Sequence, residues 1–97
     1  MSTEFNSRVT LVTGGSRGIG RATCIALARQ GARVAINYVS DKAAALATLT
    51  RVREVGGDGA IFQASVDQES AVRQMIGTIT SELGPIDFLV TNAGIAV

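Results

Sequence analysis

The chain has 97 residues, of which 46% are hydrophobic, and nine basic side chains against eight acidic ones give a formal net charge of +1. This length predicts one domain with a modest core, and the lack of a basic stripe mixed with aromatic residues argues against a nucleic-acid partner. No apolar run is long enough to cross a membrane. With no histidine and Cys24 as the single cysteine, an internal disulfide, a zinc site and a histidine-based triad are all disfavoured.

The amino-terminal stretch MSTEFNSR lacks the charged-then-apolar pattern of a signal peptide. We therefore expect residues 1–7 to form a flexible tail, residues 8–97 to form the domain, and the protein to be cytoplasmic. The free cysteine fits a reducing compartment.

Four short runs rich in β-branched residues predict strands. The predicted strands are Arg8–Thr13, Arg33–Tyr38, Ala60–Ser65 and Ile86–Thr91. The last of these, IDFLV, is apolar enough for a central strand buried on both faces. At the edge of a sheet it would leave an apolar flank that pairs with other chains.

The three longer segments between these strands have the spacing of amphipathic helices. We expect the first to end at Gly31, the second to start from an N-cap at Ser40, and the third to start from an N-cap at Asp67 and end at Gly84-Pro85. The positions expected on the buried faces are Ile19, Thr23, Ala26, Leu27 and Gln30, then Leu46, Leu49 and Val52, then Val72, Met75, Ile76, Ile79 and Leu83.

This alternation predicts an α/β fold, a Rossmann-type parallel sheet with right-handed crossovers and three-layer α/β/α packing. The first junction carries the sequence VTGGSRGIGRA, with four glycines between Gly14 and Gly20. A helix N-terminus presents unpaired N–H groups and a partial positive charge, and glycines let a bound anion approach the backbone closely. We interpret the turn as a phosphate site, and the alternative is a glycine-rich turn without a ligand.

A nucleoside-triphosphate loop is a weaker interpretation of the same glycines. That loop continues with Lys and then Ser or Thr, which reach the terminal phosphates and magnesium. Here the residues are Arg21 and Ala22, so the hydroxyl needed for metal coordination is missing.

Two motifs make the sequence resemble the short-chain dehydrogenase/reductase family, and more narrowly its 3-oxoacyl-carrier-protein reductase-like members. TGGSRGIGRA from Thr13 is similar to the family's T-G-x-x-x-G-x-G cofactor turn, and TNAGI from Thr91 is similar to its N-N-A-G-I motif. The resemblance implies the first four strands, in the order 3-2-1-4, of a doubly wound sheet that binds NAD or NADP. Strands one and four then flank the ligand crevice, where small residues let a ribose lie against the backbone. Ala93-Gly94 could instead be a simple strand exit.

The end of the second strand bears on the choice of cofactor. An acid there would bind the ribose hydroxyls of NAD and repel a 2′-phosphate, but this strand ends in Asn37-Tyr38. Arg17 offers a fixed charge and a bidentate donor, so we expect NADP(H) in preference to NAD(H). The alternative is that Arg17 is a solvated surface residue.

Two positions depart from the family pattern. Ser65-Val66 stands where the family usually has Asp-Val, which implies a weaker hold on the adenine, and Thr91 replaces the first Asn of the second motif. The residues expected to contact the cofactor are Gly14, Ser16, Arg17, Gly18, Ile19, Gly20, Asn37, Tyr38, Ser65, Val66, Asn92, Ala93 and Gly94.

The resemblance also implies what the activity needs beyond these residues. Family members use a serine and a Tyr-x-x-x-Lys pair that follow the fourth strand, and we expect the 97 residues alone to be inactive. Tyr38 and Lys42 match the spacing, but a strand end and a helix start do not place them on one helix face. The expected function is the cofactor-binding half of an NADP(H)-dependent oxidoreductase acting on a small carbonyl substrate, a homo-oligomer when full length. A non-catalytic nucleotide-binding module is the alternative.

Overall fold

Strands and helices alternate along the chain, as their sequence pattern predicts. The computed structural model describes residues 5–92. The elements are β1 (Val9–Val12), α1 (Gly18–Arg29), β2 (Arg33–Tyr38), α2 (Lys42–Glu54), β3 (Asp58–Gln63), α3 (Glu69–Glu82) and β4 (Ile86–Val90). No helix in this part of the chain is long and apolar enough to cross a membrane.

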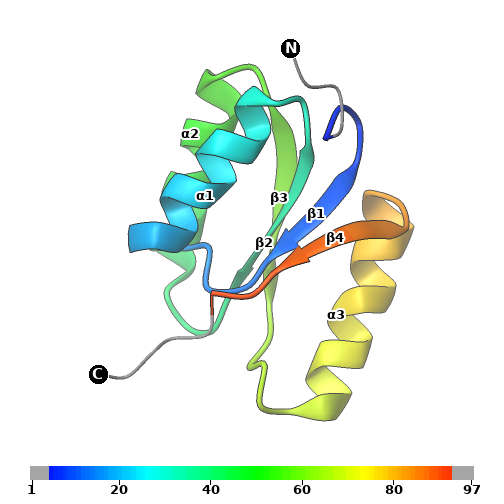
Figure 1. Ribbon diagram of the computed structural model, residues 1–97. Coiled ribbons are helices and arrows are strands. Elements are labelled where there is room, and N and C mark those ends of the chain that lie inside the picture. The colour runs from blue at the N-terminus through cyan, green and yellow to red at the C-terminus, as the bar shows by residue number, and fades with distance from the viewer. Residues whose placement is uncertain (1–4, 93–97) are drawn as a thin grey trace.

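The four strands form one parallel sheet in the order β3-β2-β1-β4, which confirms the predicted topology (Figure 1). Thr10 of β1 pairs with Val34 of β2 on one side and with Phe88 of β4 on the other. The register between β1 and β4 shifts before Thr10, and there the carboxylate of Asp87 accepts a hydrogen bond of 3.0 Å from the backbone N–H of Val9.

Helices cover both faces of the sheet, α1 and α2 on one and α3 on the other (Figure 1). This is the three-layer arrangement that the alternation predicts. Each face has its own core. The core beneath α1 and α2 contains Val12, Cys24, Leu27, Ala28, Ala32, Val34, Ile36, Leu49 and Val52. The core beneath α3 contains Val9, Leu11, Ala35, Phe62, Ala64, Met75, Ile79 and Leu83.

The buried faces of the helices differ in part from the predicted ones. In α1 the buried residues are Gly20, Cys24, Leu27 and Ala28, whereas Ile19 is 77% exposed. The prediction was wrong for Ile19, Ala26 and Gln30, which are exposed, and right for Leu27. Small buried residues bring this helix close to the sheet. In the other two helices Leu46 and Ile76 are exposed, whereas Leu49, Val52, Met75, Ile79 and Leu83 are buried as predicted.

The helix caps also correct the sequence prediction. Asp41 rather than Ser40 caps α2, and its side chain accepts a hydrogen bond from the N–H of Ala44. The N-cap position of α3 is Gln68 rather than Asp67, and β3 lies two residues earlier than predicted. Predicted element boundaries are uncertain by this amount because neighbouring polar residues can each supply a cap.

Residues 5–7 form a packed turn rather than part of a flexible tail. The N–H of Ser7 donates to the carbonyl of Gly31, and the ring of Phe5 lies 5.0 Å from that of Phe88. Residues 1–4 lie outside the described part of the chain.

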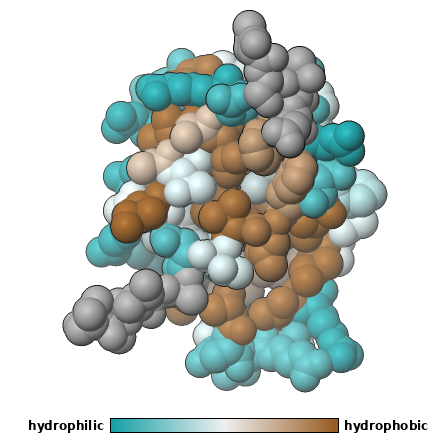
Figure 2. All heavy atoms as spheres, in the orientation of Figure 1, coloured by the Kyte–Doolittle hydropathy of each residue, from teal (hydrophilic) through white to brown (hydrophobic). Residues whose placement is uncertain are grey.

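Strand β4 lies at the edge of the sheet, with β1 as its neighbour. Its side chains Phe88 and Leu89 are 39% and 59% exposed, and hydrophobic atoms gather in the middle of the face that carries β4 (Figure 2). The apolar flank expected for IDFLV at an edge is therefore present in the described structure.

Candidate functional site

The glycine turn joins the carboxyl end of β1 to the start of α1 and packs backbone against backbone. Gly14 and Gly18 have left-handed φ angles of +64° and +60°. A Cβ on Gly20 would lie 1.9 Å from the carbonyl oxygen of Gly14 and 2.8 Å from Nδ2 of Asn92. Because real Cβ atoms essentially never approach other atoms within 3.0 Å, the contact between the turn and the first turn of α1 requires glycine at position 20.

The start of α1 has the properties of an anion site. Its N-cap residue, Arg17, makes no side-chain capping hydrogen bond, and no acidic residue lies in the first turn. The first N–H groups of a helix have no partner within the helix and carry a partial positive charge. A Cβ on Gly18 would meet no atom within 4 Å, so the surface there is open. These features fit a phosphate or diphosphate group held by main-chain amides.

Asn37 supports the turn from beneath the surface. Its Oδ1 accepts from the N–H of Gly14 at 3.3 Å, and its backbone carbonyl accepts from the N–H of Gly15 at 2.9 Å. Its Nδ2 donates to the carbonyls of Ala64 at 3.0 Å and Phe62 at 3.3 Å. Asn37 is 1% exposed, so it positions the turn and has no open surface for the direct ligand contact expected from the sequence.

Tyr38, the next residue along β2, is also buried. Tyr38 ends a strand and Lys42 begins α2. The Tyr-x-x-x-Lys pattern therefore spans two elements, and its side chains do not share a helix face, as the sequence analysis expects.

Arg21 fixes the turn from the side of α2, a role that the sequence analysis missed. Its guanidinium donates to the carbonyls of Ser16 at 2.7 Å and Ala44 at 3.0 Å and to Oγ1 of Thr48 at 2.9 Å. Thr48, which is fully buried, donates its own hydroxyl proton to the carbonyl of Ser16 at 3.0 Å. Since the C=O and N–H of a trans peptide point in opposite directions, holding the Ser16 carbonyl toward α2 turns the N–H of Arg17 away from α2.

The rim of the site beyond β2 carries an ion pair. Nη2 of Arg17 contacts Oδ2 of Asp41, the N-cap residue of α2, and both side chains are partly exposed. Ile19 stands at the same end of α1 and is open to solvent. The cation predicted to face the ribose is therefore present, but it has a carboxylate partner.

The loop after β3 forms another part of the rim. Its residue Ser65 donates a hydrogen bond to Oδ1 of Asp67, and Val66 is 47% exposed. Asp67, which the sequence predicts as a helix cap, instead binds the hydroxyl of Ser65. The loop presents a hydroxyl–carboxylate pair where a single Asp was the expected family feature.

The second motif lies directly against the glycine turn. The N–H of Asn92 donates to Oγ1 of Thr13 at 2.9 Å, and Nδ2 of Asn92 lies 3.4 Å from the carbonyl oxygen of Gly14. The N–H of Thr13 in turn donates to the carbonyl of Val90 at 3.0 Å. The predicted meeting of the two motifs is confirmed as far as Asn92, whereas Ala93 and Gly94 lie outside the described residues.

Cys24 lies beneath the turn as a packed side chain. It is fully buried, and its Sγ lies 3.0 Å from the place that a Cβ on Gly15 would occupy. Burial raises the pKa of the Cys24 thiol to about 12. The thiol is therefore protonated and unreactive at neutral pH.

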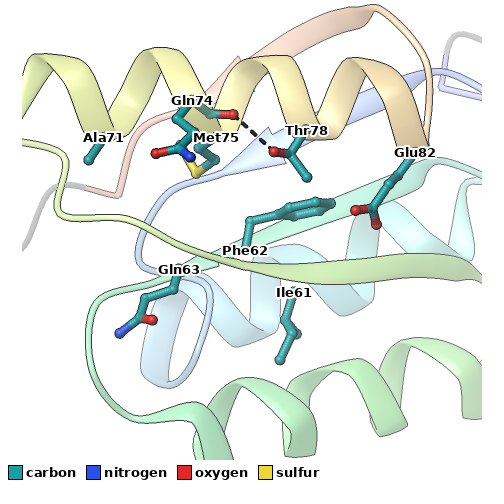
Figure 3. Close-up of a pocket in the computed structure, with 8 residues that line it drawn as sticks. All are labelled: Ile61, Phe62, Gln63, Ala71, Gln74, Met75, Thr78 and Glu82. Atoms are coloured by element: carbon teal, nitrogen blue, oxygen red, sulfur yellow. Dashed lines mark hydrogen bonds between the residues drawn. The ribbon is translucent and has the colours of Figure 1, made fainter.

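A separate hollow of about 400 Å³ opens between β3 and α3 (Figure 3). Phe62 and Met75 lie in it, and Glu82 is the one ionisable residue among those that line it. Thr78 donates its hydroxyl to the carbonyl of Gln74 within α3, so this polar atom is satisfied within the helix. The residues that line the hollow include no cluster of reactive groups. The glycine turn is therefore the better candidate for a functional site among the described residues.

Known proteins are similar to this chain over nearly its whole length. The family model for short chain dehydrogenase matches residues 8–97. The 3-oxoacyl-[acyl-carrier-protein] reductase of Synechocystis sp. is 43% identical over 93 residues, which are 96% of this chain and 38% of that protein. The short-chain dehydrogenase/reductase homolog YusS of Bacillus subtilis is 40% identical over 89 residues, which are 92% of this chain and 82% of YusS. The chain thus spans 38% of the Synechocystis reductase but most of YusS.

Solved structures show the same arrangement. A dehydrogenase/reductase from Sinorhizobium meliloti matches with a TM-score of 0.91 at 37% identity, over 97% of this chain and 37% of that one. The NADH-dependent reductase A1-R′, solved in complex with NAD, matches with a TM-score of 0.89 at 37% identity, over 97% of this chain and 39% of its own.

Proposed function

Because the chain belongs to the short-chain dehydrogenase/reductase family, we propose that residues 8–97 are the cofactor-binding part of an NADP(H)-dependent oxidoreductase. The reaction is hydride transfer between the nicotinamide and a carbonyl or alcohol substrate. The observation that carries the proposal is the open, uncapped start of α1 in direct contact with Asn92.

The residues of this chain bind and orient the dinucleotide. The main-chain amides from Ser16 to Gly20 would hold the diphosphate, while Asn37 binds the amides of Gly14 and Gly15 and Arg21 binds the carbonyl of Ser16, which keeps the turn from reorienting. When bound, the cofactor supplies or accepts the hydride at its nicotinamide ring. The serine and the Tyr-x-x-x-Lys pair that the family resemblance implies belong outside these residues.

The preference for NADP(H) rests on Arg17 and on the absence of a carboxylate within β2. A guanidinium binds a 2′-phosphate through two parallel hydrogen bonds. Arg17→Asp is expected to weaken the binding of NADPH more than that of NADH, which fluorescence titration measures. Equal losses for the two would contradict the preference.

The names of several relatives support a substrate class for this proposal. A ketone or a 3-oxoacyl thioester fits, since several relatives are named 3-oxoacyl-[acyl-carrier-protein] reductases. We further propose that the complete enzyme is a cytoplasmic homo-oligomer. Reduction of such a substrate with NADPH by the complete enzyme, which includes the serine and the Tyr-x-x-x-Lys pair, tests the activity, and failure of that enzyme with every small ketone and thioester tried would count against it.

A non-catalytic nucleotide-binding module is the second candidate, and the similarity to YusS favours it because this chain covers 82% of that protein. Titration of the purified protein with NADPH, NADH and ATP, together with its intact native mass, separates the candidates. A native protein of about 10.0 kDa that binds NADPH without oxidising it supports the module. Binding of ATP in preference to both dinucleotides would refute both proposals.

A further inference from the structure

Two helix N-termini meet at the rim of the glycine turn through one ion pair. Arg17 is the N-cap residue of α1 and Asp41 is the N-cap residue of α2. Nη2 of Arg17 contacts Oδ2 of Asp41, and the side chains are 68% and 42% exposed. The pair is open to solvent, so a ligand can reach it.

The carboxylate of Asp41 is held in place by its own helix. Its Oδ1 accepts a hydrogen bond of 3.0 Å from the N–H of Ala44, and its backbone carbonyl accepts from the N–H of Ala45. The capping bond fixes one oxygen, and the other oxygen faces Arg17. The guanidinium therefore meets an oriented carboxylate rather than a freely rotating one.

The end of β2 adds no cation to this rim, since Asn37 and Tyr38 are both buried. Arg21 is bound to two carbonyls and a hydroxyl. Two exposed cations remain near the pair, Arg17 itself and Lys42, the first residue of α2. Of these two, Arg17 is the one that Asp41 binds.

We propose that Asp41 sets the balance between NADP(H) and NAD(H) by competing with the 2′-phosphate for Arg17. A 2′-phosphate must take the guanidinium from a bound carboxylate and then lie near that negative charge, whereas a 2′-hydroxyl meets neither cost. The inference rests on the proposed function. It implies that the preference for NADP(H) is smaller than Arg17 alone would produce.

Asp41→Asn tests the competition while leaving the cap intact. Asparagine is as good an N-cap as aspartate, so the bond to Ala44 is retained and only the charge is lost. Calorimetric titration of the purified protein with adenosine 2′,5′-bisphosphate and with 5′-AMP isolates the 2′-phosphate from the nicotinamide end of the cofactor. We expect up to about fivefold tighter binding of the bisphosphate, the upper limit of what an exposed ion pair is worth, and a smaller change for 5′-AMP.

The double variant Arg17→Met/Asp41→Asn completes a thermodynamic cycle. Without Arg17 the gain from Asp41→Asn should be smaller than with Arg17, because no guanidinium is released and only the loss of the nearby negative charge remains. Retention of the full gain would overturn the inference.

A matched control is available at the other end of the sheet. Asp58, which pairs with Arg33 at the start of β3, also belongs to an exposed ion pair, and Asp58→Asn changes the net charge by the same amount. Asp58→Asn should leave the ratio of the two dissociation constants unchanged. An equal gain in the control, or no change in Asp41→Asn, overturns the inference while NADPH binding by the unmodified protein upholds the proposed function. Failure of the unmodified protein to bind any of these nucleotides refutes the proposed function and this inference together.

Discussion

Gly20 provides a sharp test of the packing at the glycine turn, because helix propensity and packing make opposite predictions there. Replacement of a helical glycine by alanine normally stabilises a helix by about 1 kcal/mol. In this structure the new Cβ would lie 1.9 Å from the carbonyl oxygen of Gly14, about 1.1 Å inside the 3.0 Å limit for real Cβ contacts. Neither the Cβ nor the carbonyl oxygen can rotate away, because the backbone fixes the position of each. The clash is therefore relieved only if the turn and α1 move apart.

The cost of such overpacking reaches about 3 kcal/mol, which leaves a net loss of about 2 kcal/mol after the propensity gain. For a domain of this size we expect Gly20→Ala to lower the melting temperature by about 8–16 °C. The separation also moves the Gly14 carbonyl and the amides beside it, so NADPH binding should be lost. Scanning calorimetry and a fluorescence titration measure the two effects.

Gly77 is the matched control, a helical glycine in α3 where an added Cβ meets nothing within 4 Å. Gly77→Ala should gain the ordinary helix propensity and raise the melting temperature by about 4–8 °C, with nucleotide binding unchanged. If Gly20→Ala melted at or above the temperature of the wild type, the close contact between the turn and α1 would be refuted.

Three further predictions concern the groups beneath the turn. Asn37→Leu leaves the N–H of Gly14 and the carbonyl of Ala64 buried without a partner, and should lower the free energy of unfolding by about 2–5 kcal/mol in urea titrations. Arg21→Met should weaken NADPH binding more than adenosine binding, because the guanidinium holds the turn that binds phosphate and not the adenine. Burial raises the pKa of Cys24 from 9.0 to about 12, so the thiol should react with iodoacetamide in urea but not in the native protein. The contribution of the buried neutral thiol to the free energy of unfolding is complete below pH 9. It is lost as the pH rises toward 12, because the thiol ionises in the unfolded chain before it ionises in the folded protein.

Each of these predictions has a control or a contradicting outcome. Arg53 on α2 is exposed, so Arg53→Met should change neither stability nor binding beyond experimental error. An equal loss of NADPH and adenosine affinity in Arg21→Met would indicate general unfolding of the site. Cys24→Ala should flatten the fall in stability between pH 9 and 12, and a variant with the same fall would assign it to other groups. If Asn37→Leu lowered the free energy of unfolding by less than about 1 kcal/mol, water would have to replace the side-chain amide as the hydrogen-bond partner of these backbone groups.

The parallel sheet was predictable because strand and helix patterns alternate along the chain, which calls for right-handed crossovers. The strand order, and with it the meeting of the two motifs at the ends of β1 and β4, was implied by the family resemblance. Small side chains and positive φ angles at Gly14 and Gly18 have few uses besides a close backbone approach. Such signals lie within a few residues of one another in the sequence.

The residues that hold the turn could not be predicted in the same way. Arg21 reaches Thr48 across 27 positions, and Asn37 reaches Gly14 across 23 and Ala64 across 27. A polar residue gives no sign in the sequence of which distant backbone group it will bind. In the sequence Arg21 stands out only because it replaces the Lys of a nucleoside-triphosphate loop, and its partners in the structure are two carbonyl oxygens and the hydroxyl of Thr48. Asn37 was assigned to the ligand because it ends a strand, although its side chain is buried.

The amide of Asn37 has a mechanical consequence for the whole sheet. Its hydrogen bonds join the backbone of Gly14 to that of Phe62 and Ala64. The same side chain therefore holds both the glycine turn and the end of β3, the outermost strand. Local opening of β3 would break the hydrogen bonds that hold the turn and make the turn more mobile. By the same coupling, a ligand bound to the turn would make local opening of β3 less frequent. Amide protons along β3 should therefore exchange with deuterium more slowly once a dinucleotide is bound.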